Sequence, residues 1–278
     1  MTIYCIGRSV DEVAAALNQP VTELYARCVR NKLTPHPKKS EYMLIHRGSF
    51  TGSHPPIYLG NNILEWVIQS RLLGVDIDDK LNWSAHIEGL KKSFVNKLSL
   101  IKKSRFLPEQ DLLHLYFEFI IPAVTYGISV WGGTNRSDDF DSLERLHCRA
   151  ARLIFNLPKD LPSVEALTRA KWDTLRTYYK NSILKLIYKM YYNDSPPCMT
   201  AHIAKSQSSY NLRNRLKLEI PHFKSNIKKS AVSYRGTILW NFLPIGCRMA
   251  NSVNSFSKMI NNLTLVRDIH LIPKWPSF

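Results

Sequence analysis

In the first third of the chain, the spacing of apolar residues changes from helical to alternating. Ser9 is followed by two acids and then by apolar residues at helical intervals, which predicts a helix with Ser9 as its N-cap. We expect this helix to end before Pro20, because proline lacks the N–H that a helix interior needs, and a second helix to cover residues 21–33. Residues 37–48 predict one strand, and residues 57–78 predict two or three more.

The rest of the chain has apolar residues at every third or fourth position, which is the spacing of one helix face. Three amphipathic helices on short loops are expected within residues 84–156 and would form a bundle. A long helix is predicted for residues 163–192, a basic loop for 205–230, and then a small cluster around the sequence WNFLP and a terminal helix. The buried face of the second bundle helix is predicted to consist of Leu112, Tyr116, Phe119 and Ile120.

Together these elements predict a mainly helical α+β fold in three parts. Residues 1–83 hold helices and a small antiparallel sheet, and residues 84–156 form the three-helix bundle. Residues 157–278 form a helical and basic C-terminal region. A chain of 278 residues is long enough to bury a substantial core in this arrangement.

The charge of the chain is large and unevenly placed. The formal net charge is +16, from 38 Lys and Arg against 22 Asp and Glu. Residues 156–278 contribute 19 basic against 6 acidic side chains, whereas the parts before them are close to balance. Such an excess favours a polyanionic partner, with nucleic acid first and an anionic membrane surface second.

Cysteine spacing and apolar runs bear on the compartment. The five cysteines are far apart and form no Cys-x-x-Cys pair, so neither a zinc knuckle nor a disulfide framework is predicted. The first 17 residues lack the basic start and long apolar stretch of a signal peptide. The most apolar segment, residues 115–131, contains Glu118 and Pro122 and is short for a membrane span. We expect an intracellular protein that is not secreted and has no membrane partner.

Three acids lie within four positions, Asp76, Asp78 and Asp79, directly after an apolar run. Clustered carboxylates can hold divalent metal ions for nucleotidyl transfer. The spacing does not match a calcium loop, because its fifth and sixth positions would be Lys80 and Leu81. Alternation instead places Asp76 and Asp78 on the polar face of a strand. We therefore favour a structural role and predict no metal site.

The bundle also contains an arginine stripe. Arg145, Arg149 and Arg152 recur at helical intervals and share one face, where they could contact phosphate or pair with the nearby Asp141 and Glu144. Two histidines of the same region, His86 and His147, favour packing over catalysis. The residues predicted to contact nucleic acid are Lys91, Lys92, Arg145, Arg149, Arg152, Arg213, Arg215, Lys217, Lys228 and Lys229.

Several segments resemble a known family in order and spacing. Residues 72–87, 115–133 and 143–158, and then 210–221 and 230–244, are similar to the reverse transcriptases of non-LTR, jockey-like retrotransposons. The resemblance implies the end of a polymerase palm for residues 1–83, a thumb for 84–156 and the family's C-terminal region for the remainder.

The resemblance also implies that the catalytic acids are absent. In this family they lie upstream, and Met1 to Ser9 resembles the strand just after the Asp-Asp turn. We therefore expect a truncated RNA-directed DNA polymerase that is not an enzyme as given and has no cofactor of its own. Mg²⁺ is expected only for a full-length parent, and RNA or an RNA–DNA hybrid is the expected partner.

Two further features follow from the resemblance alone. Lys39 resembles an accessory lysine that assists pyrophosphate departure, and Leu72, Leu73 and Gly74 resemble the segment near the primer grip. Two alternatives stay open: a helical protein-interaction module without a nucleic-acid role, and a decayed element fragment. The oligomeric state is not indicated by the sequence.

Overall fold

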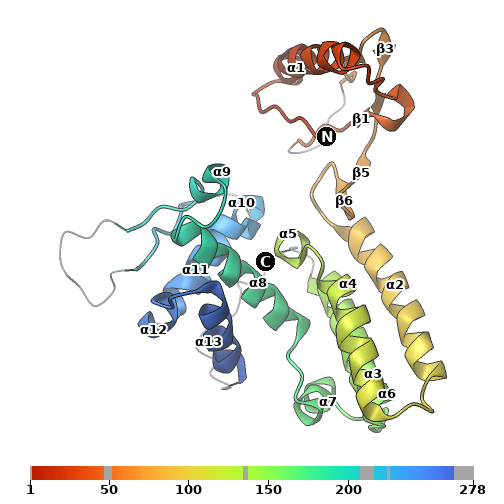
Figure 1. Cartoon of the computed structure of the whole chain (residues 1–278), viewed down its shortest axis with the longest axis vertical. Coiled ribbons are helices and arrows are strands. Elements are labelled where there is room, and N and C mark those ends of the chain that lie inside the picture. Colours follow the sequence, from red (N-terminus) through yellow and green to blue (C-terminus); the bar gives the residue numbers. More distant parts are fainter. Residues whose placement is uncertain (1, 47–51, 134–136, 207–215, 224–225, 266–278) are drawn as a thin grey trace. The chain divides into compact units, whose positions relative to one another are not determined.

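The computed structural model describes residues 2–46, 52–133, 137–206, 216–223 and 226–265 (Figure 1). The chain divides into two compact units, Met1–His86 and Ile87–Phe278, which are described separately below. The division into three parts that the sequence suggested stays a prediction. The mainly helical α+β fold class is confirmed.

The first unit is built on one long helix, α1 (Val10–Arg30), whose N-cap Ser9 accepts a hydrogen bond from the backbone N–H of Glu12. The prediction that a helix ends before Pro20 was wrong, since Pro20 lies inside α1. Residues from both halves of the helix, Ala14 and Val21, pack into one apolar cluster. Burial of this shared face stabilises the helix across the proline, where one backbone hydrogen bond is lost. The partners of the helix in this cluster are Ile57, Leu59 and Leu64.

The strands of this unit are short and form three separate pairs. They are β1 (Glu41–Tyr42), β2 (Tyr58–Leu59), β3 (Asn62–Ile63), β4 (Glu65–Trp66), β5 (Gln69–Leu72) and β6 (Val75–Asp78). Strands β2 and β3 pair antiparallel, as do β5 and β6, but β1 and β4 are parallel. The expectation of an antiparallel sheet was therefore wrong for one pair. In the sequence, the β2–β3 hairpin separates β1 from β4. This connection lets the chain return so that β4 runs parallel to β1.

The strand expected over residues 37–48 is also much shorter than predicted. Pro37–Lys39 form a 3₁₀ turn, η1, and only the two residues of β1 follow in strand conformation. Proline at the first position of a 3₁₀ turn is favoured, because its φ angle is already helical.

The second unit begins with the predicted amphipathic helices. They comprise α2 (Ser84–Lys103), then α3 (Glu109–His114), the π-helical segment η2 (Leu115–Ile120), α4 (Ile121–Thr125) and α5 (Ile128–Trp131), and finally α6 (Ser137–Ile154). Phe94 of α2 is buried and its ring centroid lies 6.4 Å from that of Tyr116 in η2. The helix pair α2 and α3 is visible in Figure 1. Apolar residues at helical spacing along α2, namely Ile87, Phe94, Leu98 and Ile101, are buried, as expected of an amphipathic helix.

The second bundle helix differs from prediction at Phe119, whose side chain is 55% exposed. Residues Tyr116, Ile120 and Ile121 are buried instead. The π-helical turn is wider than an α-helical turn, so it shifts the buried face away from Phe119. It lies directly before Pro122, whose missing N–H and bulky ring disturb an α-helix at this point. Within the described residues, no helix combines the length and apolarity that a membrane crossing requires.

The long helix predicted for residues 163–192 is two helices, α7 (Ser163–Ala170) and α8 (Leu175–Tyr191). Lys171 adopts the left-handed conformation, with φ of 56°, and ends α7. Thr174 then caps α8 by accepting a hydrogen bond from the backbone N–H of Thr177. The break allows Trp172 to stack on Tyr116, with ring centroids 4.5 Å apart. The predicted helix is therefore interrupted at the segment where Trp172 packs on Tyr116.

The C-terminal region packs around α8. Its helices are α9 (Pro197–Thr200), α10 (Asn226–Ser230), α11 (Val232–Phe242), α12 (Ile245–Arg248) and the expected terminal helix α13 (Val253–Leu265). Trp240 of α11 stacks on Tyr191 of α8, and Phe256 of α13 stacks on Tyr188 of α8. Both Trp240 and Phe256 are completely buried. In the predicted basic loop, the described residues include α10 and one bridge between Lys205 and Leu218.

Helix α11 approaches α8 closely at Gly236. A Cβ atom at this position would lie 2.5 Å from Cγ1 of Ile187 and 3.0 Å from Cγ2 of Ile183. We predict that Gly236→Ala lowers the free energy of unfolding by about 1–3 kcal/mol, because the two helices must move apart. Urea unfolding followed by tryptophan fluorescence would measure this change.

Gly246→Ala is the matched control, because no atom lies within 4 Å of the Cβ position there. Its free energy of unfolding should stay unchanged or rise slightly, since alanine favours helix over glycine. Equal losses in both variants would contradict the close-packing argument.

Candidate nucleic-acid interface

Two arginines of the stripe on α6 are exposed, and the third forms hydrogen bonds within the protein. Arg145 and Arg149 are exposed and make no hydrogen bond or ion pair within the described part of the chain. Arg152 donates from Nη2 to the carbonyl oxygen of Leu161 at 2.6 Å and to Oγ of Ser163 at 3.3 Å. Arg145 and Arg149 can therefore reach a phosphate, whereas Arg152 ties α6 to the loop before α7.

The acids that could have neutralised this stripe have other partners. Asp141 accepts a hydrogen bond from Nη2 of Arg176 at 2.5 Å. Glu144 accepts one from the backbone N–H of Leu175 at 3.1 Å, at the start of α8. Neither acid pairs with Arg145, so its charge stays available at the surface.

The predicted lysines of α2 differ in the same way. Nζ of Lys91 lies 3.1 Å from a carboxylate oxygen of Glu88. Lys92 is exposed and has no such partner among the described residues. Lys92 is therefore the stronger candidate for a phosphate contact on this helix.

The C-terminal candidates are only partly described. Lys228 and Lys229 lie together on α10, and Nζ of Lys228 is 5.8 Å from the ring centroid of Phe223. Lys217 is partly buried beside the Lys205–Leu218 bridge. Arg213 and Arg215 lie outside the described residues. Within the described ranges, no contact joins the lysines of α10 to the arginines of α6.

One basic cluster was not indicated by the sequence pattern. Nη2 of Arg105 donates to Oδ1 of Asn156 at 2.5 Å, which joins the end of α2 to the end of α6. The exposed Lys102 and Lys103 therefore lie at the same end of the bundle as Arg149. Hydrophobic periodicity cannot reveal this proximity, because it reports the faces of helices and not which of their ends meet.

The acids after the apolar run have structural roles. Asp78 accepts hydrogen bonds from the backbone N–H groups of Lys80, Asn82 and Trp83, at 3.0, 3.0 and 2.8 Å. A carboxylate oxygen of Asp76 lies 3.6 Å from Nδ1 of the buried His86. Burial lowers the pKa of His86, which keeps the ring neutral near pH 7.

The segment compared with the primer grip is the turn of the β5–β6 hairpin. Leu73 and Gly74 have φ angles of 48° and 84°, which fit a two-residue turn with both residues left-handed. Leu73 is 82% exposed, although such a turn usually holds Asn or Gly. Lys39 ends the 3₁₀ turn η1 in the same unit.

A buried polar cluster holds the bundle to the start of α8. Nε2 of His147 lies 2.9 Å from the carbonyl oxygen of Asp173, and its Nδ1 lies 2.5 Å from the hydroxyl of Tyr116. A carbonyl only accepts, so Nε2 carries the hydrogen and Nδ1 accepts from Tyr116. Burial lowers the pKa of His147 to about 4, which is consistent with this neutral form. His147 therefore has the packing role that the sequence favoured.

Glu144 lies beside this cluster. Burial raises the pKa of its carboxyl to about 7, although the N–H groups at the start of α8 and the charge of Arg176 oppose this rise. Removal from water disfavours the ionised form more than these contacts favour it.

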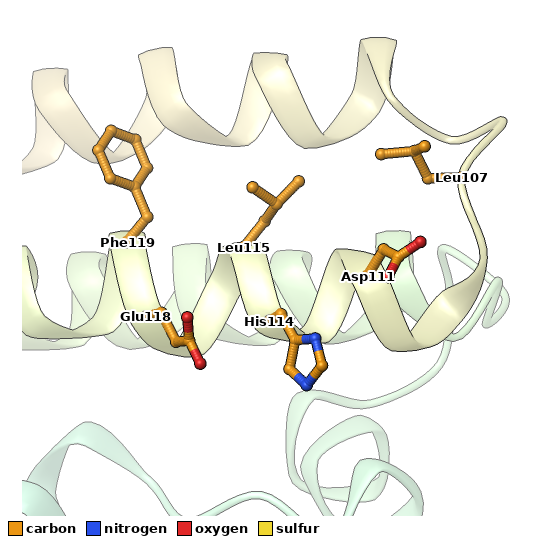
Figure 2. A pocket seen from close by; sticks show the side chains of 6 residues that line it. All are labelled: Leu107, Asp111, His114, Leu115, Glu118 and Phe119. Carbon is orange, nitrogen blue, oxygen red and sulfur yellow. The ribbon is translucent and has the colours of Figure 1, made fainter.

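A surface hollow of about 410 Å³ lies along α3 and η2 (Figure 2). Leu107, Leu115 and Phe119 form its apolar wall, and Asp111 and Glu118 add two carboxyl groups. Leu115 and Phe119 are 41% and 55% exposed. The hollow thus combines an exposed apolar strip with negative charge on an otherwise basic chain.

Two proteins of Drosophila melanogaster are similar to this chain in sequence. The probable RNA-directed DNA polymerase from transposon BS is 24% identical over 152 residues, which cover 53% of this chain and 17% of that protein. The RNA-directed DNA polymerase from mobile element jockey is 23% identical over 186 residues, which cover 64% and 20%. The chain contains a region related to jockey-like reverse transcriptases.

This reverse-transcriptase-related chain spans no more than about a fifth of the length of these relatives. No protein-family model and no solved structure matches it. The resemblance seen in the sequence is thus confirmed by its relatives, and the fold described above rests on the chain's own structure.

The resemblance to RNA-directed DNA polymerases implies Mg²⁺ for a full-length parent, so the acids of the described residues are the candidates to hold this ion. No group of three or more His, Cys, Asp or Glu side chains that could hold a metal ion occurs among them. The run of Asp76, Asp78 and Asp79 does not fit the ion either, because Asp78 is occupied by three backbone N–H groups. No reaction step is derived through a metal for this reverse-transcriptase-related chain. The roles of Lys39 and of the Leu73-Gly74 turn stay predictions.

We predict that Asp78→Ala destabilises the turn of residues 79–83. The carboxylate satisfies three backbone N–H groups, and Leu81 and Trp83 adopt left-handed φ angles of 53° and 64° that need this support. Amide hydrogen exchange of Asn82 and Trp83 should become at least about tenfold faster, which corresponds to a loss of about 1–2 kcal/mol.

Asp79→Ala serves as the control for Asp78→Ala, since the Asp79 carboxylate has no hydrogen-bond partner among the described residues. The exchange rates of the turn should stay unchanged in this control. If both variants accelerate exchange equally, the carboxylate of Asp78 does not hold the turn.

We predict that Glu144→Gln stabilises the protein at high pH only. The carboxyl has a folded pKa of about 7 against an ordinary value of 4.5, so its contribution to stability is present below pH 4.5 and is lost as the pH rises to 7. Glutamine keeps an oxygen for the N–H of Leu175 and removes the ionisation. At pH 8 the variant should exceed the native chain by about 1–3 kcal/mol in free energy of unfolding, and the two should converge below pH 4.5.

His147 changes stability with pH in the opposite direction. Its folded pKa of about 4 lies below the ordinary 6.5, so stability is lost as the pH falls from 6.5 to 4. In Glu144→Gln this acid-induced loss should become steeper, because the gain from Glu144 no longer offsets it. Glu219→Gln, at an exposed carboxyl, is the control and should follow the native profile. A constant difference between Glu144→Gln and the native chain at all pH values would contradict the burial argument.

Proposed function

We propose that this chain binds the backbone of RNA or of an RNA–DNA hybrid, as a non-catalytic part of a reverse-transcriptase-related protein. The observation that carries this proposal is the charge of residues 156–278, with 19 basic against 6 acidic side chains. The two relatives are named as RNA-directed DNA polymerases, so a nucleic-acid partner fits the sequence similarity. Its action inside the cell is part of the same proposal.

The surface side chains support contact with phosphate groups. Lys92, Arg145 and Arg149 are exposed and carry charges that no described acid neutralises. Lysine and arginine on helix surfaces contact phosphates without reading bases, so this binding would be salt-sensitive and low in sequence specificity.

We further propose that the chain does not perform nucleotidyl transfer by itself. The three hydrogen bonds that Asp78 accepts from backbone N–H groups, and the position of the Asp76 carboxylate 3.6 Å from the buried His86 ring, support structural roles for these acids. The parent polymerase would then supply Mg²⁺ and its ligands from sequence outside this chain.

We predict that the chain binds single-stranded RNA with a strong dependence on salt. Its affinity should fall by a factor of about ten or more between about 50 and 200 mM salt. The double variant Arg145→Gln/Arg149→Gln should lower the slope of log affinity against log salt by about 1.4, because each lost phosphate contact removes about 0.7. Fluorescence anisotropy with labelled RNA, and separately with an RNA–DNA hybrid, would measure the salt slope of the native chain and that of the double variant.

Arg169→Gln is the matched control, since Arg169 is exposed but pairs with Glu165 at 2.6 Å. This variant should leave the slope nearly unchanged. A slope near zero for the native chain, or an equal decrease in the control, would refute backbone binding by α6.

A protein-interaction module is the second candidate, favoured by the exposed apolar side chains of Leu115 and Phe119 beside the carboxyl groups of Asp111 and Glu118. A partner with a basic and apolar segment would suit this hollow. When an acidic polypeptide of equal charge is added as competitor, the anisotropy experiment separates a nucleic-acid function from general charge attraction. Competition as strong as that of unlabelled RNA would favour general charge attraction over a nucleic-acid function.

A further inference from the structure

The turn between α2 and α3 presents an exposed aromatic ring. Phe106 is 84% exposed, and its ring contacts no aromatic ring or cation within the described part of the chain. Leu107, the next residue, is partly buried and is directed from the same turn toward the hollow along α3 (Figure 2). The turn therefore uses one apolar side chain for packing and leaves the other in solvent. A single exposed phenylalanine is common on protein surfaces, so its surroundings decide what it can do.

The backbone around Phe106 is held in place from two sides. The backbone N–H of Leu107 donates to the carbonyl oxygen of Ser104 at 2.9 Å, which closes the turn. Nη2 of Arg105 donates to Oδ1 of Asn156 at 2.5 Å, which ties the turn to the end of α6. Because the ring is presented from a fixed backbone, a ligand that packs on it has little chain freedom to restrict.

Two lysines lie next to this ring. Lys102 and Lys103 are in the last turn of α2, four and three positions before Phe106. Both are exposed and have no ion-pair partner among the residues that the structure describes. Their charges are therefore available to an anionic ligand that reaches the ring.

The second helix adds charge at the same end of the bundle. Lys159 is exposed on the loop after α6, three positions beyond the asparagine that binds Arg105. We refer to residues 102–108 and 155–159 as the bundle tip, which contains four basic residues and no acid. One acid directly follows each of the two segments, so the tip keeps a net positive charge.

An aromatic ring beside unpaired cations fits the chemistry of single-stranded nucleic acid. Any base can stack on an aromatic side chain, while lysine contacts the phosphates without reading sequence. In a duplex, each base is covered by its neighbours on both faces. The ring of Phe106 can therefore stack only on an unpaired base or on a base at an end.

An anionic membrane surface fits the bundle tip less well. Binding to such a surface favours several apolar side chains on one face of an amphipathic helix, beside cations. Phe106 is instead followed by the inward-directed Leu107, and Glu109 and Asp111 then open α3. An anionic surface would repel these two carboxyl groups.

We propose that the bundle tip binds a single-stranded segment of RNA, with an unpaired base stacked on Phe106 and the flanking phosphates on Lys102 and Lys103. This inference rests on the function proposed above and deepens it by naming the form of nucleic acid that is bound. Contacts of Arg145 and Arg149 with phosphate alone would not distinguish paired from unpaired strands. Stacking on Phe106 would make that distinction.

The experiment measures binding of the full chain by fluorescence anisotropy. The probes are a labelled single-stranded RNA, an abasic oligomer with the same number of phosphates, and an RNA duplex. Phe106→Ala should weaken binding of the single strand about tenfold, and should leave binding of the abasic oligomer unchanged because it has no base to stack. The duplex should be affected less than the single strand. Phe106→Trp should bind the single strand at least as well as the native chain.

Salt dependence separates the ring from the charges. Phe106→Ala should keep the native slope of log affinity against log salt, since it removes no charge. Lys102→Gln/Lys103→Gln should lower this slope by about 1.4 and should weaken binding of the single strand and of the abasic oligomer alike. Phe242→Ala is the matched control, because Phe242 is 51% exposed at the end of α11 and lies outside the bundle tip. It should leave every affinity unchanged.

The outcomes separate this inference from the proposed function. Equal affinity of the native chain for the single strand and the abasic oligomer, or unchanged binding in Phe106→Ala, would overturn the stacking site, while salt-dependent RNA binding would still support the proposed function. Equal weakening by Phe106→Ala and Phe242→Ala would overturn the site too. Absence of RNA binding by the native chain would refute the proposed function itself.

Vesicles of phosphatidylserine and phosphatidylcholine test the membrane alternative. We expect them to compete poorly with the single-stranded RNA, and equally in the native chain and in Phe106→Ala. Strong competition that is lost in Phe106→Ala would assign the ring to a lipid surface and overturn the stacking site.

Discussion

The structure of the second unit depends on the burial of α8 on nearly every side. Leu175, Tyr179, Ile183, Ile187 and Tyr191 are all buried, although they do not form one narrow stripe. A helix that is apolar around most of its circumference is stable only when other helices cover it. Helices α5, α11 and α13 supply this cover, and Gly236 allows α11 to approach closely enough.

The start of α8 couples this core to the bundle. Trp172 stacks on Tyr116 from one side, and His147 bonds to the backbone of Asp173 from another. Glu144 binds the first N–H of α8, where a negative charge is favoured by the helix dipole but opposed by burial. Because these contacts lie inside the protein, the charges available for a partner are those on the outer faces, such as Arg145 and Arg149.

The acidic run at residues 76–79 shows how composition can suggest chemistry that the geometry does not support. Its carboxylates could have converged on a metal ion, yet Asp78 holds a turn and Asp76 lies beside a buried imidazole. Positive charge is the feature on which the proposed binding of nucleic acid rests.

Local patterns in the sequence determined the Ser9 cap, the buried stripe of α2, the exposure of Arg145 and Arg149, and the basic C-terminal region, since each depends on side-chain type at nearby positions. Tertiary structure alone decided the continuity of α1 through Pro20, the exposure of Phe119 and the break of the long helix at Lys171. It also decided that Arg152 binds a loop rather than solvent. Sequence spacing tells which side chains are apolar or charged, but it does not tell which distant residues bury them or form hydrogen bonds with them.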